Sequence, residues 1–250
     1  MIAIDCGNTR LKWARFEGLE RRDGGHASFL DEVDPFAALG SALIDESERV
    51  LVANVAGDEV AGRVAEAVRM ALGREPEFVA VEASAHGIEC AYPDPGTLGV
   101  DRWVAMIAAR RLVDGPFVVV GAGTALTFDA VDGRGQHLGG LILPGDRLML
   151  EALASRAEQL PAVEPADGAP AGLRLLGRST AEAMSYGARL ALAAAVDRAA
   201  AAVATALDAT PTVFLTGGDA PVLADWLASE ASVRADLVLE GLAVIGGDEG

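Results

Sequence analysis

Residues 1–12 have the sequence MIAIDCGNTRLK, in which an apolar strand, Ile2 to Cys6, leads into a turn of small polar residues. Gly7 lets the backbone approach a phosphate, neighbouring hydroxyl and amide groups can bond its oxygens, and the Asp5 carboxylate can hold a hydrated magnesium ion. The pattern therefore favours a turn that binds the phosphates of a nucleotide triphosphate. An ordinary strand-turn-strand hairpin is the simpler alternative, because Asp, Gly and Asn also tolerate tight turns.

A second stretch repeats this design near the middle of the chain. Residues 117–129, FVVVGAGTALTFD, again form an apolar run, a turn of small residues that contains Thr124, and a second apolar run. Two such units in one chain predict a duplicated architecture with a ligand held between two halves. A dinucleotide-binding fingerprint fits less well, because Leu126 stands where its third glycine belongs and strand-like sequence follows.

The remaining sequence alternates strand-like and helix-like segments, which is typical of an α/β protein. The linker Asp114-Gly115-Pro116 precedes the second copy, so the predicted domains are 1–114 and 115–250. Strands are predicted at 2–6, 11–16, 50–54, 77–81, 117–121, 125–131, 212–216 and 237–239, and an amphipathic helix at 58–72.

Two further helices are predicted from their start signals. One covers 102–112, with Asp101 as its N-cap. The other begins at Ser179-Thr-Ala-Glu182, a capping box, and reaches about residue 207, broken or kinked at Gly187. The apolar stretch inside this helix contains charged residues, so we expect it to be packed in a soluble protein.

Composition limits the classes of function. At 250 residues, 51% of them hydrophobic, the chain can bury one large core or two modest ones. A formal net charge of −17 argues against nucleic acid, which is bound through summed Lys and Arg contacts. No basic-then-apolar segment precedes the first strand, so we expect a cytoplasmic protein without a membrane span. Lys12, Arg102 and bound cations are the candidates for positive charge beside a nucleotide.

The cysteines and histidines do not predict a metal centre. Cys6 and Cys90 are the only cysteines, and two thiols in such a chain are expected to be small buried groups rather than a disulfide. Cys6, inside the first turn, is expected to be partly exposed. His26, His86 and His137 lack the spacing of metal ligands.

The ordered set of further motifs resembles the type III pantothenate kinase family. After Asp5-Cys-Gly-Asn-Thr9 come Tyr92-Pro93 with Gly99-Val-Asp101-Arg102, Gly139-Gly140 with Pro144-Gly145, Ser179-Thr180 with Gly187, and Thr216-Gly217-Gly218. The resemblance extends from Met1 to Gly241. It implies two ribonuclease-H-like domains of the actin and hexokinase superfamily, to which acetate and sugar kinases belong, with a nucleotide cleft between them. It also implies ATP-dependent phosphorylation of pantothenate to 4'-phosphopantothenate, the first step of coenzyme A biosynthesis.

The resemblance further assigns roles to residues. ATP would be bound by the first turn, the second turn and a glycine pair, that is by Asp5, Cys6, Gly7, Asn8, Thr9, Arg10, Leu11, Lys12, Gly123, Thr124, Gly217 and Gly218. Asp5 would hold magnesium, directly or through water. Pantothenate would be bound by Tyr92, Gly99, Val100, Asp101, Arg102 and, from the neighbouring subunit of a homodimer, Thr180.

Asp101 has the chemistry that the implied reaction needs. Phosphoryl transfer to a primary alcohol requires a carboxylate within hydrogen-bond reach of the attacking hydroxyl, and Asp101 is the expected base. Arg102 could pair with a carboxylate or phosphate and keep Asp101 ionised. Without the flanking motifs, a helix cap at Asp101 and a surface ion pair at Arg102 would be the simpler interpretation. With those motifs, we expect the catalytic role.

One position departs from the family pattern. Gly121 stands where the family usually has an aspartate that helps to bind a monovalent cation, typically potassium or ammonium. Glycine has no side chain for this purpose, so cation dependence is expected to be weak or altered. Either backbone carbonyls and other residues hold the cation, or the enzyme works without it, or its activity is reduced. A backbone that requires a positive φ at Gly121 is a further explanation for the glycine. The departure leaves open a nucleotide-binding regulatory relative, similar to Bvg accessory factors, with little or no kinase turnover. A kinase with a different acceptor is a third possibility.

Overall fold

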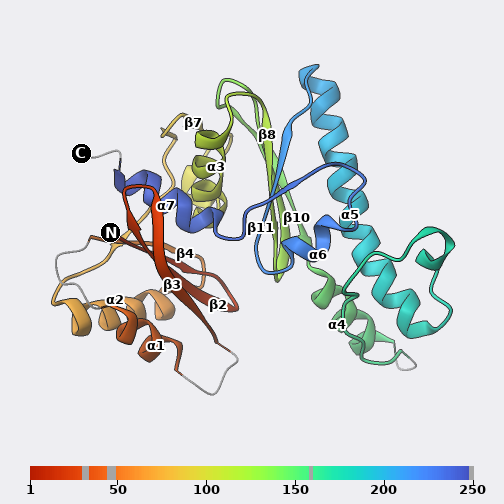
Figure 1. Ribbon diagram of the computed structural model, residues 1–250, viewed down its shortest axis with the longest axis horizontal. Coiled ribbons are helices and arrows are strands. Elements are labelled where there is room, and N and C mark those ends of the chain that lie inside the picture. The colour runs from red at the N-terminus through yellow and green to blue at the C-terminus, as the bar shows by residue number, and fades with distance from the viewer. Residues whose placement is uncertain (30–33, 44–48, 158–159, 248–250) are drawn as a thin grey trace. The chain divides into compact units, whose positions relative to one another are not determined.

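Each half of the chain is built around a five-stranded sheet in the computed structural model, which describes residues 1–29, 34–43, 49–157 and 160–247 (Figure 1). The strands of the first sheet are β1 (Ile2–Cys6), β2 (Arg10–Glu17), β3 (Glu20–Ser28), β4 (Val50–Asn54) and β5 (Glu77–Phe78). Those of the second are β8 (Phe117–Ala122), β9 (Ala125–Val131), β10 (His137–Pro144), β11 (Thr212–Thr216) and β12 (Ser232–Val233). A short hairpin of β6 (Ser84–Ala85) and β7 (Ile88–Glu89) forms a separate pair.

The two sheets have the same strand order. It is β3-β2-β1-β4-β5 in the first and β10-β9-β8-β11-β12 in the second. In both, three strands form an antiparallel meander, and two later strands run parallel to the first strand on its other side. This repetition, with helices between the strands, agrees with the α/β fold of two ribonuclease-H-like units that the sequence predicts.

Helices cover both faces of the first sheet. One face carries α1 (Pro35–Ala42) and α2 (Asp58–Leu72), and the other carries α3 (Val100–Leu112) and α7 (Leu237–Gly247) (Figure 1). Successive side chains of a strand point to opposite faces. Ile2, Ile4 and Cys6 of β1 therefore enter the core formed with α1 and α2. Asp5, which lies between Ile4 and Cys6, belongs to the face that α7 covers.

The sequence of α2 explains its position. Val64, Val68 and Leu72, four residues apart, are its buried residues and give the helix one apolar face. The negative charge of Asp58 in the first turn is stabilised by the positive end of the helix dipole. Gly73 ends the helix in the left-handed region, at φ 66°, where glycine is preferred. These bounds agree with the helix predicted over 58–72.

The core of the second unit lies on one face of its sheet. There α5 (Thr180–Leu207) and α6 (Ala220–Ala224) pack against β8, β9 and β11. After β10, α4 (Asp146–Arg156) begins and packs against α5. The two 3-10 helices of the chain's described part are Pro95–Thr97 and Gly172–Leu175. The core consists of Val118, Val120, Ala122, Leu126, Phe128, Ala130, Leu192, Ala193, Val196, Ala200, Val213, Leu215, Ala220, Leu223 and Trp226.

Length and composition alone would allow α5 to cross a membrane. In the structure, Leu192, Ala193 and Val196 are instead buried in the core of the second unit. Arg189 of the same helix is buried in an ion pair with Asp146 of α4. These contacts show that α5 packs within its own unit, as the sequence predicts.

The C-terminal segment differs from its prediction. Residues 237–239, predicted as a strand of the second domain, begin helix α7. Because α7 packs against α3 and β1, the first unit consists of Met1–Leu112 with Asp236–Gly250, and the second of Val113–Ala235. The Leu- and Val-rich sequence is compatible with a strand, but tertiary packing overrides this local preference. Gly241 permits the packing, since a Cβ there would collide with the backbone oxygen of Val104.

Three element boundaries also differ. Helix α3 begins at Val100, so Asp101 lies in its first turn rather than at the N-cap. The strand predicted over 77–81 is limited to Glu77–Phe78. Helix α5 continues through Gly187 without the predicted break. Helix ends and single glycines are weak local signals, because one or two residues of helix cost little free energy either way.

The predicted start of α5 is confirmed in its main feature. The Ser179 hydroxyl accepts the N–H of Glu182 at 3.2 Å, as an N-cap does. The Glu182 carboxylate accepts the N–H of Arg178 at 2.7 Å, one residue before the partner expected in a capping box. Both bonds satisfy backbone donors at the helix start, so the sequence signal located α5 correctly.

Candidate active site

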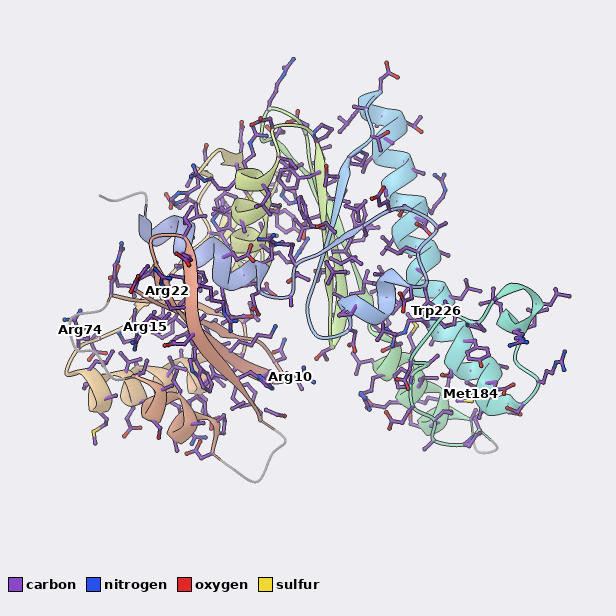
Figure 2. The ribbon with its side chains drawn as sticks, in the orientation of Figure 1. Arg10, Arg15, Arg22, Arg74, Met184 and Trp226 are labelled. Carbon is purple, nitrogen blue, oxygen red and sulfur yellow. The ribbon has the colours of Figure 1, made fainter. Side chains whose placement is uncertain are left out.

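The first turn is a tight hairpin between β1 and β2. Asp5 and Lys12 face each other as cross-strand partners, and the Gly7 N–H donates to the Arg10 carbonyl at 3.1 Å. The turn residue Asn8 is exposed, as is Arg10, whose side chain leaves the start of β2 (Figure 2). The hairpin alternative was therefore correct about the local geometry. It does not compete with phosphate binding, because the exposed turn presents backbone and side-chain donors at its tip.

Cys6 does not have the partial exposure that its sequence position suggests. Its side chain is fully buried in the core with α1 and α2, and burial together with the Asp5 charge raises its pKa to about 12. A thiol with so high a pKa is a poor nucleophile and metal ligand. Leu11 is buried in the same core. Only the backbone of these two residues is available to a nucleotide.

The pKa of Asp5 in the first turn is also strongly raised. Burial raises its pKa from 3.8 to about 7, Lys12 opposes this rise, and the charges of Asp101 and Asp236 add to it. The Asp101 carboxylate on α3 is thus close enough to influence Asp5 on β1. A cluster of carboxylates that resist joint ionisation favours a bound cation, which would remove their mutual repulsion.

Asp236 is a member of this cluster that the sequence did not reveal. Its carboxylate lies 3.9 Å from Lys12 Nζ and 3.7 Å from Arg21 Nε of β3. It immediately precedes α7, and its carbonyl oxygen accepts the Glu240 N–H in the first turn of that helix. No local signal marks Asp236, because its place beside the turn depends on the return of α7 to the first unit.

The proposed acceptor-binding residues meet at the start of α3. The Arg102 side chain is only 7% exposed and donates from Nη1 to the Tyr92 hydroxyl at 3.3 Å. Its guanidinium also lies 5.8 Å from the centre of the Tyr92 ring. Asp101 Oδ1 accepts the Arg102 N–H at 2.8 Å, and a Cβ at Gly99 would lie 2.7 Å from that oxygen. Gly99 therefore leaves the space that the Asp101 carboxylate occupies.

The second turn is formed where three segments of the second unit converge. Gly123 and Thr124 connect β8 to β9, and Thr124 is exposed. Gly145, just before α4, donates its N–H to the Thr124 carbonyl at 3.0 Å. Gly217, at the end of β11, lies against Ala122, because β11 and β8 are parallel neighbours. Carboxyl ends of parallel strands meet at one edge of a sheet, which brings these glycines together.

Gly217 has two reasons to be glycine. Its φ is +98°, a region that other residues rarely adopt, and a Cβ would collide with the backbone of Ala122. Gly218, beside it, is exposed. The glycine pair therefore presents bare backbone next to the second turn.

Gly121 does not need a positive φ, so that explanation for the glycine is wrong. It lies in β8, paired with Thr127 of β9 and Thr216 of β11. A Cβ at Gly121 would lie 2.6 Å from Thr127 Oγ1. The hydroxyl of Thr127 thus occupies the space into which an aspartate side chain would extend.

The residues described by the structure contain no group of three or more His, Cys, Asp and Glu side chains placed to hold a metal ion. Magnesium does not require such a group, because it usually keeps several waters and takes one or two carboxylates together with substrate phosphates. Asp5, with its raised pKa and a lysine opposite, fits this limited role. Cys6 and Cys90 are free thiols, as predicted.

Thr180 lies apart from both turns in the sequence, at the first position of α5, where it is exposed. It lines an apolar groove between α4 and α5, and Met184 of α5 lies in the same groove (Figure 2). The other residues that line it are Met149, Leu153, Leu160, Ala183, Gly187, Ala188 and Ala191.

Two sheets of identical strand order, with a small-residue turn after the central strand of each, are typical of the ribonuclease-H-like fold that acetate and sugar kinases share. A family model described as type III pantothenate kinase matches residues 1–202. The type III pantothenate kinase of Aromatoleum aromaticum is 40% identical over 248 residues, which cover 98% of this chain and 97% of that relative. That of Nitrosococcus oceani is 34% identical over 259 residues, covering 99% and 94%. The chain belongs to the type III pantothenate kinase family, and the predicted resemblance is confirmed.

Solved structures agree on the fold. A putative Baf family transcriptional activator from Campylobacter jejuni has a TM-score of 0.62 at 20% identity, covering 100% of this chain and 98% of that one. A putative 2-dehydro-3-deoxygalactonokinase from Sinorhizobium meliloti has a TM-score of 0.59 at 13% identity, covering 99% and 98%. At these identities the likeness concerns the fold alone.

Proposed function

We propose that this protein phosphorylates pantothenate to 4'-phosphopantothenate with ATP, in the cytoplasm, as the first step of coenzyme A biosynthesis. The observation that carries the proposal is the grouping of Asp101 with Asp5 in the first unit, where the charge of one influences the pKa of the other. A base for the acceptor and a carboxylate for the cation must lie close together if phosphoryl transfer is to occur between them. Membership of the family supplies the substrate.

ATP is assigned to both turns and to the glycine pair. The first turn offers the backbone of residues 5–12 and the Lys12 ammonium, and the second offers Gly123, Thr124 and the backbone of Gly217 and Gly218. Bare backbone beside a small-residue turn can approach phosphate and nucleoside closely. Magnesium held by Asp5 supplies positive charge to the phosphates, which Lys12 reinforces from across the hairpin.

Asp101 is assigned the role of base for the pantothenate hydroxyl. Its position in the first turn of α3 is fixed by its bond to the Arg102 N–H and by the absence of a side chain at Gly99. Arg102, held by Tyr92, is placed to bind the pantothenate carboxylate. Val100 is buried and shapes this region through its backbone. A module that only bound nucleotide would have no need of this base, which favours the kinase over the regulatory alternative.

Thr180 is assigned to the pantothenate site of the partner subunit in a homodimer. The apolar groove beside it supports an interface at α5, because exposed apolar surface of this kind is usually covered by another molecule. Leu153 and Leu190, on α4 and α5, are 42% and 39% exposed. The Ala-rich face of α5 would allow close approach of a second copy.

A coupled assay with ATP, magnesium and pantothenate tests the reaction. We expect turnover of ATP that depends on pantothenate. If ATP is hydrolysed at the same rate without pantothenate, or is not consumed at all, the regulatory alternative is favoured. Replacing pantothenate by other primary alcohols tests the third possibility, a kinase with a different acceptor.

Mixing two inactive variants tests the shared site. Asp101→Asn and Thr180→Glu each damage every site of their own homodimer, but a mixed dimer contains one site with both native residues. Activity should therefore return when the two variants are co-expressed. Its failure to return, in dimers purified through two different affinity tags so that each contains both variants, would exclude a site shared between subunits.

A further inference from the structure

A buried ion pair lies at the start of α4. Asp146 is the first residue of this helix, and its Oδ2 lies 2.6 Å from Nη2 of Arg189 on α5. Both residues are 3% exposed. Arg189 Nη2 also donates to the Ala166 carbonyl at 3.3 Å, and Asp146 Oδ1 accepts the Arg147 N–H at 2.7 Å. Among the described residues, Arg189 Nε has no hydrogen-bond partner.

The pair lies next to the second turn. Gly145, the residue before Asp146, donates its N–H to the Thr124 carbonyl, and a Cβ at Gly145 would collide with the carbonyl oxygens of Gly123 and Thr124. Gly123, Asp146 and Arg189 also line the same small cavity. The start of α4 is therefore in direct backbone contact with the turn, and the ion pair fixes where α4 starts.

This arrangement is costly if its only purpose is stability. Two charges removed from water lose hydration that their mutual attraction regains only when their hydrogen bonds are complete. Here Arg189 Nε is unpaired, and the contact at Asp146 Oδ2 is too poorly aligned to count as a hydrogen bond. An apolar pair of similar size is often as stable as such an ion pair. What the ion pair adds is a defined position for α4, since Arg189 of α5 contacts both the Asp146 carboxylate and the Ala166 carbonyl.

We propose that Asp146 and Arg189 are positioning residues that hold the second turn in the shape that binds nucleotide phosphates. The pair acts through Gly145, whose N–H holds the Thr124 carbonyl and so orients Gly123 and Thr124. This inference rests on the proposed function only in taking the second turn as a nucleotide site. It also links the turn to α5, the helix on which Thr180 lies.

The test replaces the ion pair by apolar residues of similar size in the full-length protein. The double variant Asp146→Leu/Arg189→Met should keep a melting temperature near that of the wild type. Its dissociation constant for a non-hydrolysable ATP analogue, measured by calorimetry, should rise about tenfold. The KM for ATP should rise with it, while the KM for pantothenate changes little. A loss of stability alone would not produce this division between the two substrates.

Arg147→Met is the matched control. Arg147 is the next residue of α4 and forms an exposed ion pair with Glu164 at 2.6 Å. This variant should bind the analogue as the wild type does, because exposed pairs contribute little. An equal loss of affinity in Arg147→Met, or unchanged affinity in the double variant, would overturn the inference.

Arg189→Lys gives a second measurement if the double variant does not fold. Lysine keeps the charge but not the planar fork, so affinity for the analogue should fall about threefold or more. Wild-type affinity in Arg189→Lys would then overturn the inference. A wild-type protein that binds the analogue but does not phosphorylate pantothenate would contradict the proposed function and leave this inference standing.

Discussion

The two turns occupy equivalent places in their sheets, after the central strands β1 and β8, yet they are built from different chemistry. The first carries charged side chains, with Asp5 and Lys12 opposite each other and Asp236 beside Lys12. The second carries backbone in close contact, where Gly145 and Gly217 lie against the turn and the end of β8. A duplicated frame therefore does not require duplicated chemistry.

The faces of the sheets explain this difference. In the first unit, α3 and α7 bring carboxylates to the face on which Asp5 lies. In the second, β8 itself ends without a carboxylate, and the Asp146 carboxylate at the start of α4 is paired with Arg189. We infer that the first turn provides charge and the second provides shape. Four predictions separate these two contributions.

The largest effect is expected for Asp101→Asn, on the charged side of the comparison. The amide cannot accept the hydroxyl proton, so turnover should fall about 100-fold or more. Asn keeps an oxygen that can accept the Arg102 N–H, so the fold and ATP binding should be largely unchanged. Turnover should be measured together with ATP affinity and the melting temperature. Near-normal turnover in a folded variant would refute the assignment of the base.

Asp5 should make stability depend on pH. Its pKa is raised from 3.8 to about 7, so between these values the folded protein holds a proton that the unfolded chain releases. Rising pH in this window therefore lowers the free energy of unfolding, and above pH 7 the loss is complete. Asp5→Asn removes this penalty, so its stability relative to the wild type should increase by about 4 kcal/mol between pH 4 and 8.

Denaturant titrations of the magnesium-free protein at several pH values measure this difference. Asp236→Asn is the companion variant, because the Asp236 charge helps to raise the pKa of Asp5. In Asp236→Asn, the pH range over which stability falls should therefore end at a lower pH. If the free energies of unfolding of Asp5→Asn and the wild type differed by the same amount from pH 4 to 8, the charge assigned to the first turn would be contradicted.

The glycines of the second turn should divide into two kinds. Gly217→Ala forces a side chain into a positive-φ site against Ala122 and should destabilise the protein by about 1–2 kcal/mol. At Gly123 a Cβ meets no atom within 4 Å, so Gly123→Ala should leave stability unchanged. If phosphates approach Gly123, however, the KM of the Gly123→Ala variant for ATP should rise roughly tenfold. The melting temperature and the KM for ATP should be measured for both variants. If the two variants changed both quantities equally, this division would be wrong.

The smallest effect concerns the monovalent cation. Without a carboxylate at Gly121, we expect wild-type activity in sodium to be close to that in potassium. Gly121→Asp should introduce a modest potassium response of about threefold, since the backbone accepts a side chain there but Thr127 must move. Thr127→Ala combined with Gly121→Asp removes the hydroxyl from that space and should show the larger response. Potassium and sodium are titrated at constant ionic strength, and an absolute potassium requirement of the wild type would show that other residues bind the cation.

Much of the architecture could be predicted from the sequence. Both strand-turn-strand units, the helix at 58–72 and the start of the long helix at Ser179 are correct, because period-two alternation, amphipathic spacing and capping residues act over short distances. The family could also be recognised, since its motifs are local and ordered. The segment 237–239 was predicted wrongly for the opposite reason: its apolar sequence fits strand and helix, and only contact with α3 decides.

The sequence by itself determined the duplicated α/β frame, the family, and the residue types at each turn. Tertiary structure decided which side chains meet there. Asp236 reaches Lys12 only because α7 returns to the first unit, and Asp146 meets Arg189 only because α4 packs on α5. Alternation and capping depend on neighbours in the chain, whereas desolvation and ion pairing depend on residues that packing brings together from far apart. The raised pKa of Asp5 is therefore a property of the folded protein, although the aspartate itself is plain in the sequence.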